Sequence, residues 1–256
     1  MTMHRRTFAL IPLAAFTAVA LAATPSLTAQ SLSADEIVNK HLAAVGGKDA
    51  LAKITTRRAT GTMIVGTPMG DLAGPVEMVA KSPNKMRMAV SMDLSSLGAQ
   101  GEIHIEQLFD GVTGWSINSM QGDQQLSGDQ LEGAKNSYFP SPLLDYAAHG
   151  ASIALEPKAQ VNGRDAFVIR LTPKAGQASK LFFDAETFML VRTTGKVNNP
   201  QLGEVESVSE PSDYRDVNGV KVAFTMYQSA GGQNITMKFT KIENNVPVDD
   251  SIFVKK

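Results

Sequence analysis

The sequence predicts a mainly β protein whose antiparallel sheet is either closed as a barrel or strongly curled. Short runs of alternating apolar and polar residues recur along most of the chain, and this period-two pattern is typical of strands with one buried face. Turn-forming pairs such as Asn162-Gly163 and Asn218-Gly219 separate the runs. Many short strands with regular turn signals favour a sandwich or barrel architecture.

Residues 1–29 have the composition of a secretory signal peptide. Arg5 and Arg6 form a basic start, an apolar run follows at 8–23, and small residues then provide a cleavage site. The apolar run is shorter and more interrupted than the span of about 20 residues that crosses a membrane. We therefore expect a cleaved signal peptide, a periplasmic location, and a single domain over residues 30–256.

Charge and cysteine content exclude several classes of function. The 24 Lys and Arg and 25 Asp and Glu of the full chain become 22 and 25 after the signal is removed, a net charge of −3. Weak acidity argues against a nucleic-acid partner, which requires a basic surface. The chain has no cysteine, which excludes a thiol nucleophile, a thiolate metal site and a lipid anchor on an N-terminal cysteine.

The N-terminal helix is predicted by a capping box. Ser33 can accept a hydrogen bond from the backbone of Glu36, whose side chain can reach back. Gly46-Gly47 is expected to end this helix, and a further short helical turn is expected at residues 48–54. The expected buried stripe of the first helix shares one face at helical spacing and consists of Ile37, Val38, His41, Leu42 and Val45.

About eleven strands follow, interrupted in the middle of the chain. They are drawn from the runs at 60–65, 75–81, 86–92, 101–109, 113–118, 152–156, 166–172, 180–183, 190–197, 203–209, 220–228 and 234–242. The interruption begins as a helix-like segment at 127–132. A second short helix is expected at 143–150, after Pro140 and Pro142. Together these segments form the predicted helical plug.

No residue pattern indicates catalysis. His41, His104 and His149 lie in three separate elements without metal-ligand spacing, and a nucleophile elbow is absent from the sequence. The acidic pairs fall on predicted turns, where capping or solvation is the simpler explanation. We therefore expect no catalytic residue, no metal and no cofactor.

The methionines suggest a binding surface. Ten of the twelve lie beyond residue 29, and flexible, polarisable methionine suits surfaces that accept variable apolar partners. Ordinary packing of the same face beneath the helices is the simpler interpretation of the sequence alone, and both interpretations remain open. The predicted apolar hollow consists of Met78, Met86, Met88, Val90, Met92, Ile103, Ile105, Trp115, Leu143, Leu144, Phe224, Met226, Met237 and Phe239.

Five blocks of the sequence resemble the outer-membrane lipoprotein carrier (LolA-like) superfamily, and in particular its uncharacterised branches. They lie at residues 33–47, 109–118, 182–188, 212–221 and 246–253. Each is a turn-plus-strand pattern of modest specificity, and their order along the chain carries the resemblance. It implies an unclosed antiparallel β-barrel wrapped around helices that plug its hollow.

The resemblance also implies a non-covalent activity, in which the hollow sequesters acyl chains and the helices act as a lid. Arg57 and Arg58 are candidates for the gating arginine of such carriers. The expected function is a periplasmic carrier of lipids or lipid-anchored proteins for transport between membranes, and not an enzyme. The expected partners are acyl chains and the envelope proteins that load and unload them, with the carrier itself monomeric. The alternative is a regulatory or scaffolding module that binds a protein through its sheet surface.

Overall fold

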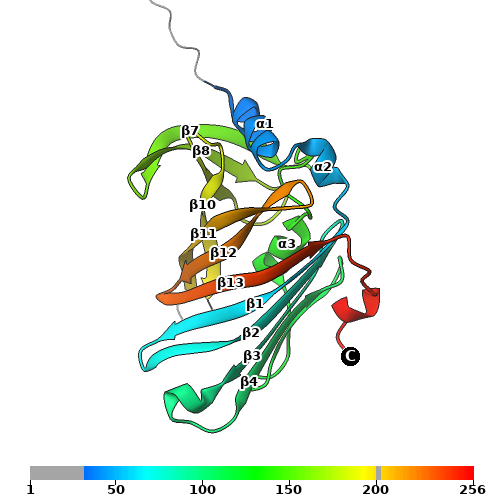
Figure 1. Ribbon diagram of the computed structural model, residues 1–256, viewed down its shortest axis with the longest axis vertical. Helices are drawn as coiled ribbons and strands as arrows, with labels where there is room; N and C mark the ends of the chain where they lie inside the picture. Colours follow the sequence, from blue (N-terminus) through cyan, green and yellow to red (C-terminus); the bar gives the residue numbers. More distant parts are fainter. Residues whose placement is uncertain (1–31, 200–202) are drawn as a thin grey trace, which may run out of the picture. The chain divides into compact units, whose positions relative to one another are not determined.

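The computed structural model describes residues 32–199 and 203–256 (Figure 1). The signal peptide expected at residues 1–29 lies outside the described residues. Within the described ranges, none of the helices has the length and apolar character needed to span a bilayer.

The described chain forms one antiparallel sheet of 13 strands, in the order β6-β5-β4-β3-β2-β1-β13-β12-β11-β10-β9-β8-β7. The strands are β1 (Thr56–Thr67), β2 (Gly70–Lys81), β3 (Lys85–Asp93), β4 (Glu102–Phe109), β5 (Gly114–Asn118), β6 (Gln124–Gln125), β7 (Ser152–Val161), β8 (Arg164–Thr172), β9 (Ser179–Asp184), β10 (Leu190–Asn199), β11 (Gly203–Val217), β12 (Val220–Ala230) and β13 (Gln233–Asn244). Because β6 and β7 are not paired with each other, the sheet is not closed. The predicted fold class, an unclosed antiparallel barrel with few helices, is confirmed, but the described chain has 13 strands where about eleven were expected.

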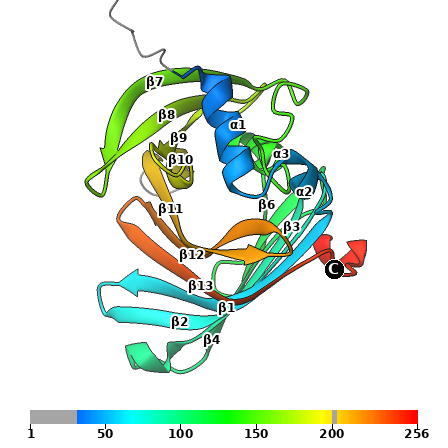
Figure 2. The same ribbon diagram turned by 45° about the horizontal axis from the view of Figure 1, so that its top comes forward.

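The sheet curls around its helices (Figure 2). Part of the curvature comes from two glycines at the centre of the sheet. A Cβ atom added to Gly61 would lie 2.1 Å from the carbonyl oxygen of Lys238, and one added to Gly74 would lie 1.8 Å from that of Ser91. Only glycine permits so close an approach of neighbouring backbones. A register shift between Thr60 and Gly61 adds a bulge at the same place, and bulges bend a strand.

Helix α1 (Ala34–Ala44) forms as the sequence predicts. The Ser33 hydroxyl accepts from the backbone N–H of Glu36, and the Glu36 carboxylate accepts from the backbone N–H of Ser33, so the capping box is complete. Gly47 closes the last turn by donating to the carbonyl of Leu42 at 2.8 Å. Helix α2 (Lys48–Ala52) follows, as expected.

The middle of the chain differs from the prediction. Helix α3 (Gly128–Asn136) lies where a helix-like segment was expected, but residues 142–150 form successive turns and not a second helix. Asp145 adopts a left-handed backbone with φ of 56°. That conformation, together with the nearby Pro142, prevents a continuous helical hydrogen-bond ladder.

Strand β11 also extends beyond its predicted end near residue 209. It continues through Pro211 and through Asp213, which has a φ of 52°. The pairing with β12 skips Asp213, so Ser212 pairs with Thr225 and Tyr214 with Ala223. The local irregularity that resembles a turn in sequence is thus a bulge inside a longer strand.

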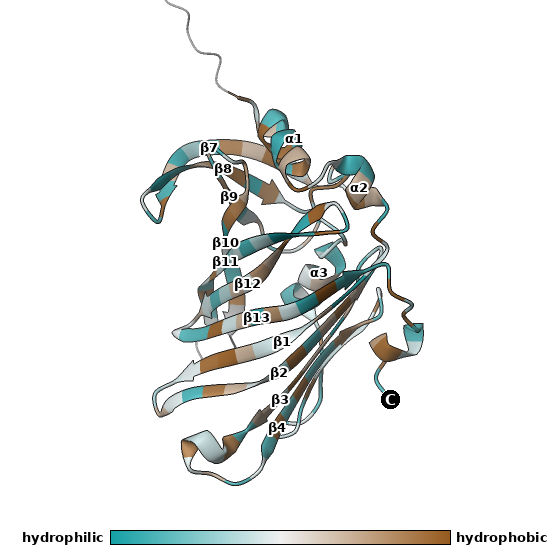
Figure 3. Cartoon of the chain, viewed as in Figure 1, coloured by the Kyte–Doolittle hydropathy of each residue, from teal (hydrophilic) through white to brown (hydrophobic). Residues whose placement is uncertain are grey.

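Two apolar clusters fill the inside of the sheet. The first, the α1 core, packs helix α1 and Leu143 against β8, β9 and the start of β12; its buried members are Ile37, Val38, Leu42, Val45, Leu51, Ile54, Leu143, Ile169, Leu181, Phe183 and Val220. The second, the methionine cluster, covers β1 to β3 and β13; its buried members are Met63, Leu72, Val76, Val90, Met92 and Met237. Figure 3 shows hydrophobic residues alternating with hydrophilic ones along these strands.

Two short 3₁₀ turns complete the fold, η1 (Leu94–Leu97) and η2 (Asp250–Phe253). The second turn lies near β3, where Asp250 accepts from Lys81 and Lys85, each at 2.7 Å. These two ammonium groups hold the pKa of Asp250 at about 2. Phe253 beside it is buried, so the C-terminal segment closes one end of the outer face.

Candidate functional site

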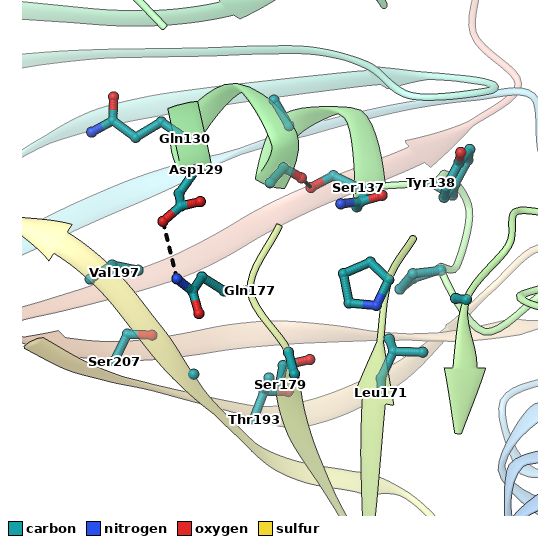
Figure 4. Close-up of a pocket in the computed structure, with 18 of the residues that line it drawn as sticks. Asp129, Gln130, Ser137, Tyr138, Leu171, Gln177, Ser179, Thr193, Val197 and Ser207 are labelled. Carbon is teal, nitrogen blue, oxygen red and sulfur yellow. Dashed lines mark hydrogen bonds between the residues drawn. The ribbon is translucent and has the colours of Figure 1, made fainter. Parts of the chain in front are cut away.

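A cavity of about 770 Å³ lies between two parts of the sheet. One wall comes from β3, β4 and β5 and the other from β8 to β11, while α3 and residues 137–143 cover the space between them. Figure 4 shows α3 on one side of the cavity and Ser179, Thr193 and Ser207 facing it from the other. A volume of about 300–1,000 Å³ is typical of sites that hold small molecules.

Hydrogen bonds hold α3 between the two walls. Asn84, in the turn before β3, donates to the carbonyl of Lys135 at 3.0 Å. On the other side, Asn136 donates to the carbonyl of Ala175 at 2.8 Å. Gln177 donates to the Asp129 carboxylate at 3.1 Å, the bond drawn in Figure 4. Because each of these bonds is a single polar contact, α3 is a plug attached at its edges and not packed into the core.

The segment after α3 is attached in a similar way. The N–H of Phe139 donates to the carbonyl of Pro83 at 2.8 Å, and Leu143 is buried in the α1 core. The Tyr146 hydroxyl donates to the Asp35 carboxylate on α1, which raises the pKa of Tyr146 to about 12. The His149 ring stacks on Tyr138 with ring centres 3.6 Å apart. Among these contacts, only that of Leu143 is buried in an apolar core.

His41 reaches the cavity from α1. Its Nδ1 lies 2.9 Å from the carbonyl oxygen of Phe188, and because a carbonyl only accepts, Nδ1 carries the proton and Nε2 is an acceptor. Burial lowers the pKa of His41. The histidine is therefore a neutral part of the cavity wall at neutral pH.

The polar residues that line the cavity are mostly uncharged. The hydroxyl- and amide-bearing members are Gln107, Ser116, Gln124, Gln130, Asn136, Ser137, Tyr138, Ser141, Gln177, Ser179, Thr193, Thr194 and Ser207. The two charged members are Asp129 and Lys196. The Lys196 ammonium lies 2.5 Å from the Glu204 carboxylate, so its charge is compensated within the protein.

Arg57 is a half-buried cation near the covering segment. Its Nε donates to the amide oxygen of Asn244 at 2.8 Å, and its guanidinium lies 5.3 Å from the centre of the Phe139 ring. Burial lowers the pKa of Arg57 to about 10, so it stays charged at neutral pH. Arg58, the other candidate, instead faces Glu77 at 3.3 Å.

Two of the predicted hollow residues, Met86 and Leu143, line this cavity. The pairing of neighbouring strands shows where the other predicted residues lie relative to the cavity. Gln107 lines the cavity and pairs directly with Met88, and directly paired residues of an antiparallel ladder lie on one face of the sheet. The methionine row of β3 therefore faces the same side as the cavity wall.

Most of the remaining predicted residues meet on that face. Members or direct neighbours of the methionine cluster include Met78, Met88, Val90, Met92, Ile103, Met226, Met237 and Phe239. Phe224 belongs to a small adjoining group that shares Met78 and Phe239 with the cluster. Ile105 is half-buried and pairs with Val90. Whether this surface admits a ligand stays a prediction.

Two predicted residues lie elsewhere. Leu144 packs against the α1 core. Trp115 precedes Ser116, which lines the cavity, and successive strand residues point to opposite faces. Trp115 accordingly faces outward, where the Lys255 ammonium lies 4.2 Å from its ring centre. The structure does not bring Trp115 together with the methionines.

The sequence reasoning missed the polar wall of β9 to β11. The prediction relied on the alternation of apolar and polar residues, which is weak in these strands. One signal was present: Glu204, Glu206 and Glu210 mark one face of β11 as solvent-exposed, which leaves Ser207 on the opposite face. Among the residues that the structure describes, we find no cluster of three or more side chains able to hold a metal ion.

Several solved structures share this architecture. A domain from Vibrio parahaemolyticus named for outer membrane lipoprotein sorting is 12% identical, with a TM-score of 0.54 over 85% of this chain and 94% of that one. A LolA superfamily protein from Nitrosomonas europaea is 12% identical, with a TM-score of 0.55 over 88% and 99% of the two chains. The chain has a LolA-like fold.

A third structure extends the comparison. A DUF1329 family protein from Desulfovibrio piger is 11% identical, with a TM-score of 0.55 over 88% of this chain and 98% of that one. No protein-family model matches the sequence, and no curated protein matches it. At this level of identity the LolA-like fold is what the proteins share.

Proposed function

We propose that this protein binds the acyl chains of lipids or of lipid-anchored proteins in the hollow of its sheet and carries them through the periplasm. The observation that supports it is that the cavity and the methionine cluster lie on the same face of the sheet. Met86 lines the cavity and begins the row that continues through Met88, Val90 and Met92 on the same face of β3. An acyl chain that enters the cavity would find an apolar surface beyond it.

The chemistry of that surface suits a chain of variable length. Each methylene group removed from water contributes about 0.8 kcal/mol without any directional contact. Methionine side chains adjust to irregular shapes, and Met78, Met88 and Met226 are only partly buried. The site favours binding, since among the described residues that line it no hydroxyl group is hydrogen-bonded to a histidine.

The covering segment supports a cycle of loading and release. Helix α3 has no buried residue and is held mainly by single hydrogen bonds, whereas the turns that follow also pack Leu143 and Leu144 against the α1 core. Elements of low local stability are the ones that open. We infer that this plug moves aside to admit a chain. The likeness to a lipoprotein-sorting domain and a LolA superfamily protein agrees with transport as the purpose.

A titration with a fluorescent fatty-acid probe tests the proposal. Thr193→Phe places a ring in the cavity, so we expect the affinity for the probe to fall at least tenfold. Thr62→Phe adds the same ring to an exposed position on β1 and should leave the affinity unchanged. A wild-type protein that takes up no probe, or a Thr193→Phe variant that binds as well as wild type, would overturn the proposal.

The alternative is a module that binds a protein partner by strand addition at a sheet edge. Strand β7 is one edge of the sheet, and Leu155 on it is 43% exposed. However, β7 also contains Pro157 and Lys158, at a register shift between Glu156 and Ala159. Proline, lysine and bulges are features that block strand addition, so we prefer the lipid carrier.

A further inference from the structure

The concave face of the sheet has two chemically different halves. On β1 to β3 and β13 it presents the methionine cluster. On β9 to β11 the cavity is lined by hydroxyl groups, here named the hydroxyl wall and formed by Ser179, Thr193 and Ser207. Figure 4 shows Ser179, Thr193 and Ser207 side by side across the cavity from α3.

The hydroxyl wall is suited to a partner that both donates and accepts hydrogen bonds. A serine or threonine hydroxyl has one donor and two acceptor positions. Gln130 on the opposite side of the cavity adds amide donors and an amide acceptor. A ligand head group with its own hydroxyls can satisfy such a wall, whereas a purely apolar end cannot.

The charges around the cavity disfavour an anionic head group. Among the described residues that line the cavity there is no arginine, and the single lysine, Lys196, is bound by Glu204 at 2.5 Å. Asp129 adds a carboxylate whose partner in the structure is the uncharged amide of Gln177. A carboxylate or phosphate prefers cationic partners and would here meet a negative charge instead.

We propose that the hollow selects amphiphiles whose head group is uncharged and carries hydroxyl groups, of the monoacylglycerol class, with the chain on the methionine cluster and the head against the hydroxyl wall. This inference rests on the proposed function, because it specifies which acyl-chain ligands the same cavity prefers. It adds a specificity that acyl-chain burial alone does not provide.

The test compares three ligands of one chain length, a monoacylglycerol, the free fatty acid and its methyl ester, by displacement of a fluorescent probe. We expect the monoacylglycerol to bind at least tenfold more tightly than either of the others. In the double variant Thr193→Val and Ser207→Ala, its affinity should fall about tenfold, the loss expected for one or two neutral hydrogen bonds. The methyl ester should change less than twofold, and Thr62→Val should change nothing.

A charge variant tests the other part of the inference. Asp129→Asn should raise the affinity for the free fatty acid about threefold relative to the affinity for the monoacylglycerol at low salt, a modest effect because Asp129 is exposed to solvent screening. Asp71→Asn removes an exposed carboxylate on β2 outside the cavity lining and is the matched control.

The outcomes separate the two proposals. Three ligands of equal affinity, or a tightest-bound fatty acid, would overturn the head-group selection and leave acyl-chain binding intact. If none of the three ligands binds, the proposed function itself fails. Thermal melts of the variants identify any loss of binding that comes from unfolding.

Discussion

The two clusters inside the sheet are built from different side chains. The α1 core contains branched and aromatic residues, and Ile37, Ile169 and Phe183 have no exposed surface. The methionine cluster instead combines buried Met63, Met92 and Met237 with methionines that are only partly buried. Branched and aromatic side chains have few rotamers and pack uniquely, whereas methionine adapts to its surroundings.

This difference assigns separate tasks to the two regions. The α1 core joins the N-terminal helix to the far end of the sheet, so it should provide most of the stability that packing can give. The methionine cluster lies on the face of the sheet on which the cavity opens, so its adaptable side chains should serve binding.

The largest effect should come from Phe183→Ala in the α1 core. Removing a fully buried aromatic ring leaves a cavity and typically costs about 3–5 kcal/mol. Urea unfolding should show that loss, while the adjacent and partly exposed Phe182 should lose clearly less when changed to alanine. Equal losses for the two variants would mean that the α1 core does not carry the stability assigned to it.

The second-largest effect should be a pH dependence of the free energy of unfolding that comes from His41, where the α1 core meets the cavity. Burial places the pKa of His41 in the folded protein below its unfolded value of about 6.5. As the pH falls through that unfolded value, the unfolded state takes up a proton before the folded state does, so stability is lost. It is fully present above about pH 7, and the slope at lower pH approaches at most about 1.4 kcal/mol per pH unit.

The free energy of unfolding measured from pH 7.5 to 5.5 checks this expectation. His41→Asn should flatten the curve in that window, and His104→Asn, at an exposed position on β4, should leave it as in wild type. Carboxyl groups with lowered pKa values, such as Asp184, lose their stabilising contribution only at more acidic pH. An unchanged slope in His41→Asn would assign the titration to another group.

A smaller effect should follow from replacing methionine by leucine. Such swaps conserve volume and usually cost less than about 1.5 kcal/mol. The double variant Met88→Leu and Met226→Leu should keep its stability but bind a narrower range of acyl-chain lengths, because leucine adapts less. Met189→Leu, beside the α1 core, is the control, and identical chain-length profiles for all three proteins would contradict a binding role for the cluster.

The smallest effect should come from Tyr146→Phe, which removes the hydroxyl bonded to Asp35. The bond is exposed, so its loss should cost less than about 1 kcal/mol. Because it ties the covering segment to α1, probe release followed by stopped-flow fluorescence should become several-fold faster. Tyr227→Phe, which removes a similar exposed bond to Asn234 at 2.9 Å, should release the probe at the wild-type rate.

Local signals in the sequence predicted much of the fold. The capping box at Ser33 and Glu36 predicted the start of α1, and Asn162-Gly163 and Asn218-Gly219 predicted two hairpin turns that have left-handed backbones at all four residues. These features depend on neighbouring residues alone. Residues 143–150 failed as a helix because the left-handed Asp145 interrupts an otherwise helical composition.

The candidate site was harder to predict from the sequence, because it depends on pairing across the sheet. Alternation correctly placed Met86, Met88 and Met92 on one face, but the direction of Trp115 follows only once Ser116 is known to line the cavity. The hydroxyl wall is formed by β9 to β11, strands in which apolar and polar residues do not alternate clearly. Its position across from α3 is a property of the curled sheet, which a linear pattern does not contain.

The decisive experiment is native mass spectrometry of the protein purified gently from its native cells, followed by lipid extraction. We expect a bound species that carries an acyl chain and is released on denaturation. A ligand-free mass, from protein that also fails to take up a fluorescent fatty-acid probe, would contradict this expectation and would favour the protein-binding alternative.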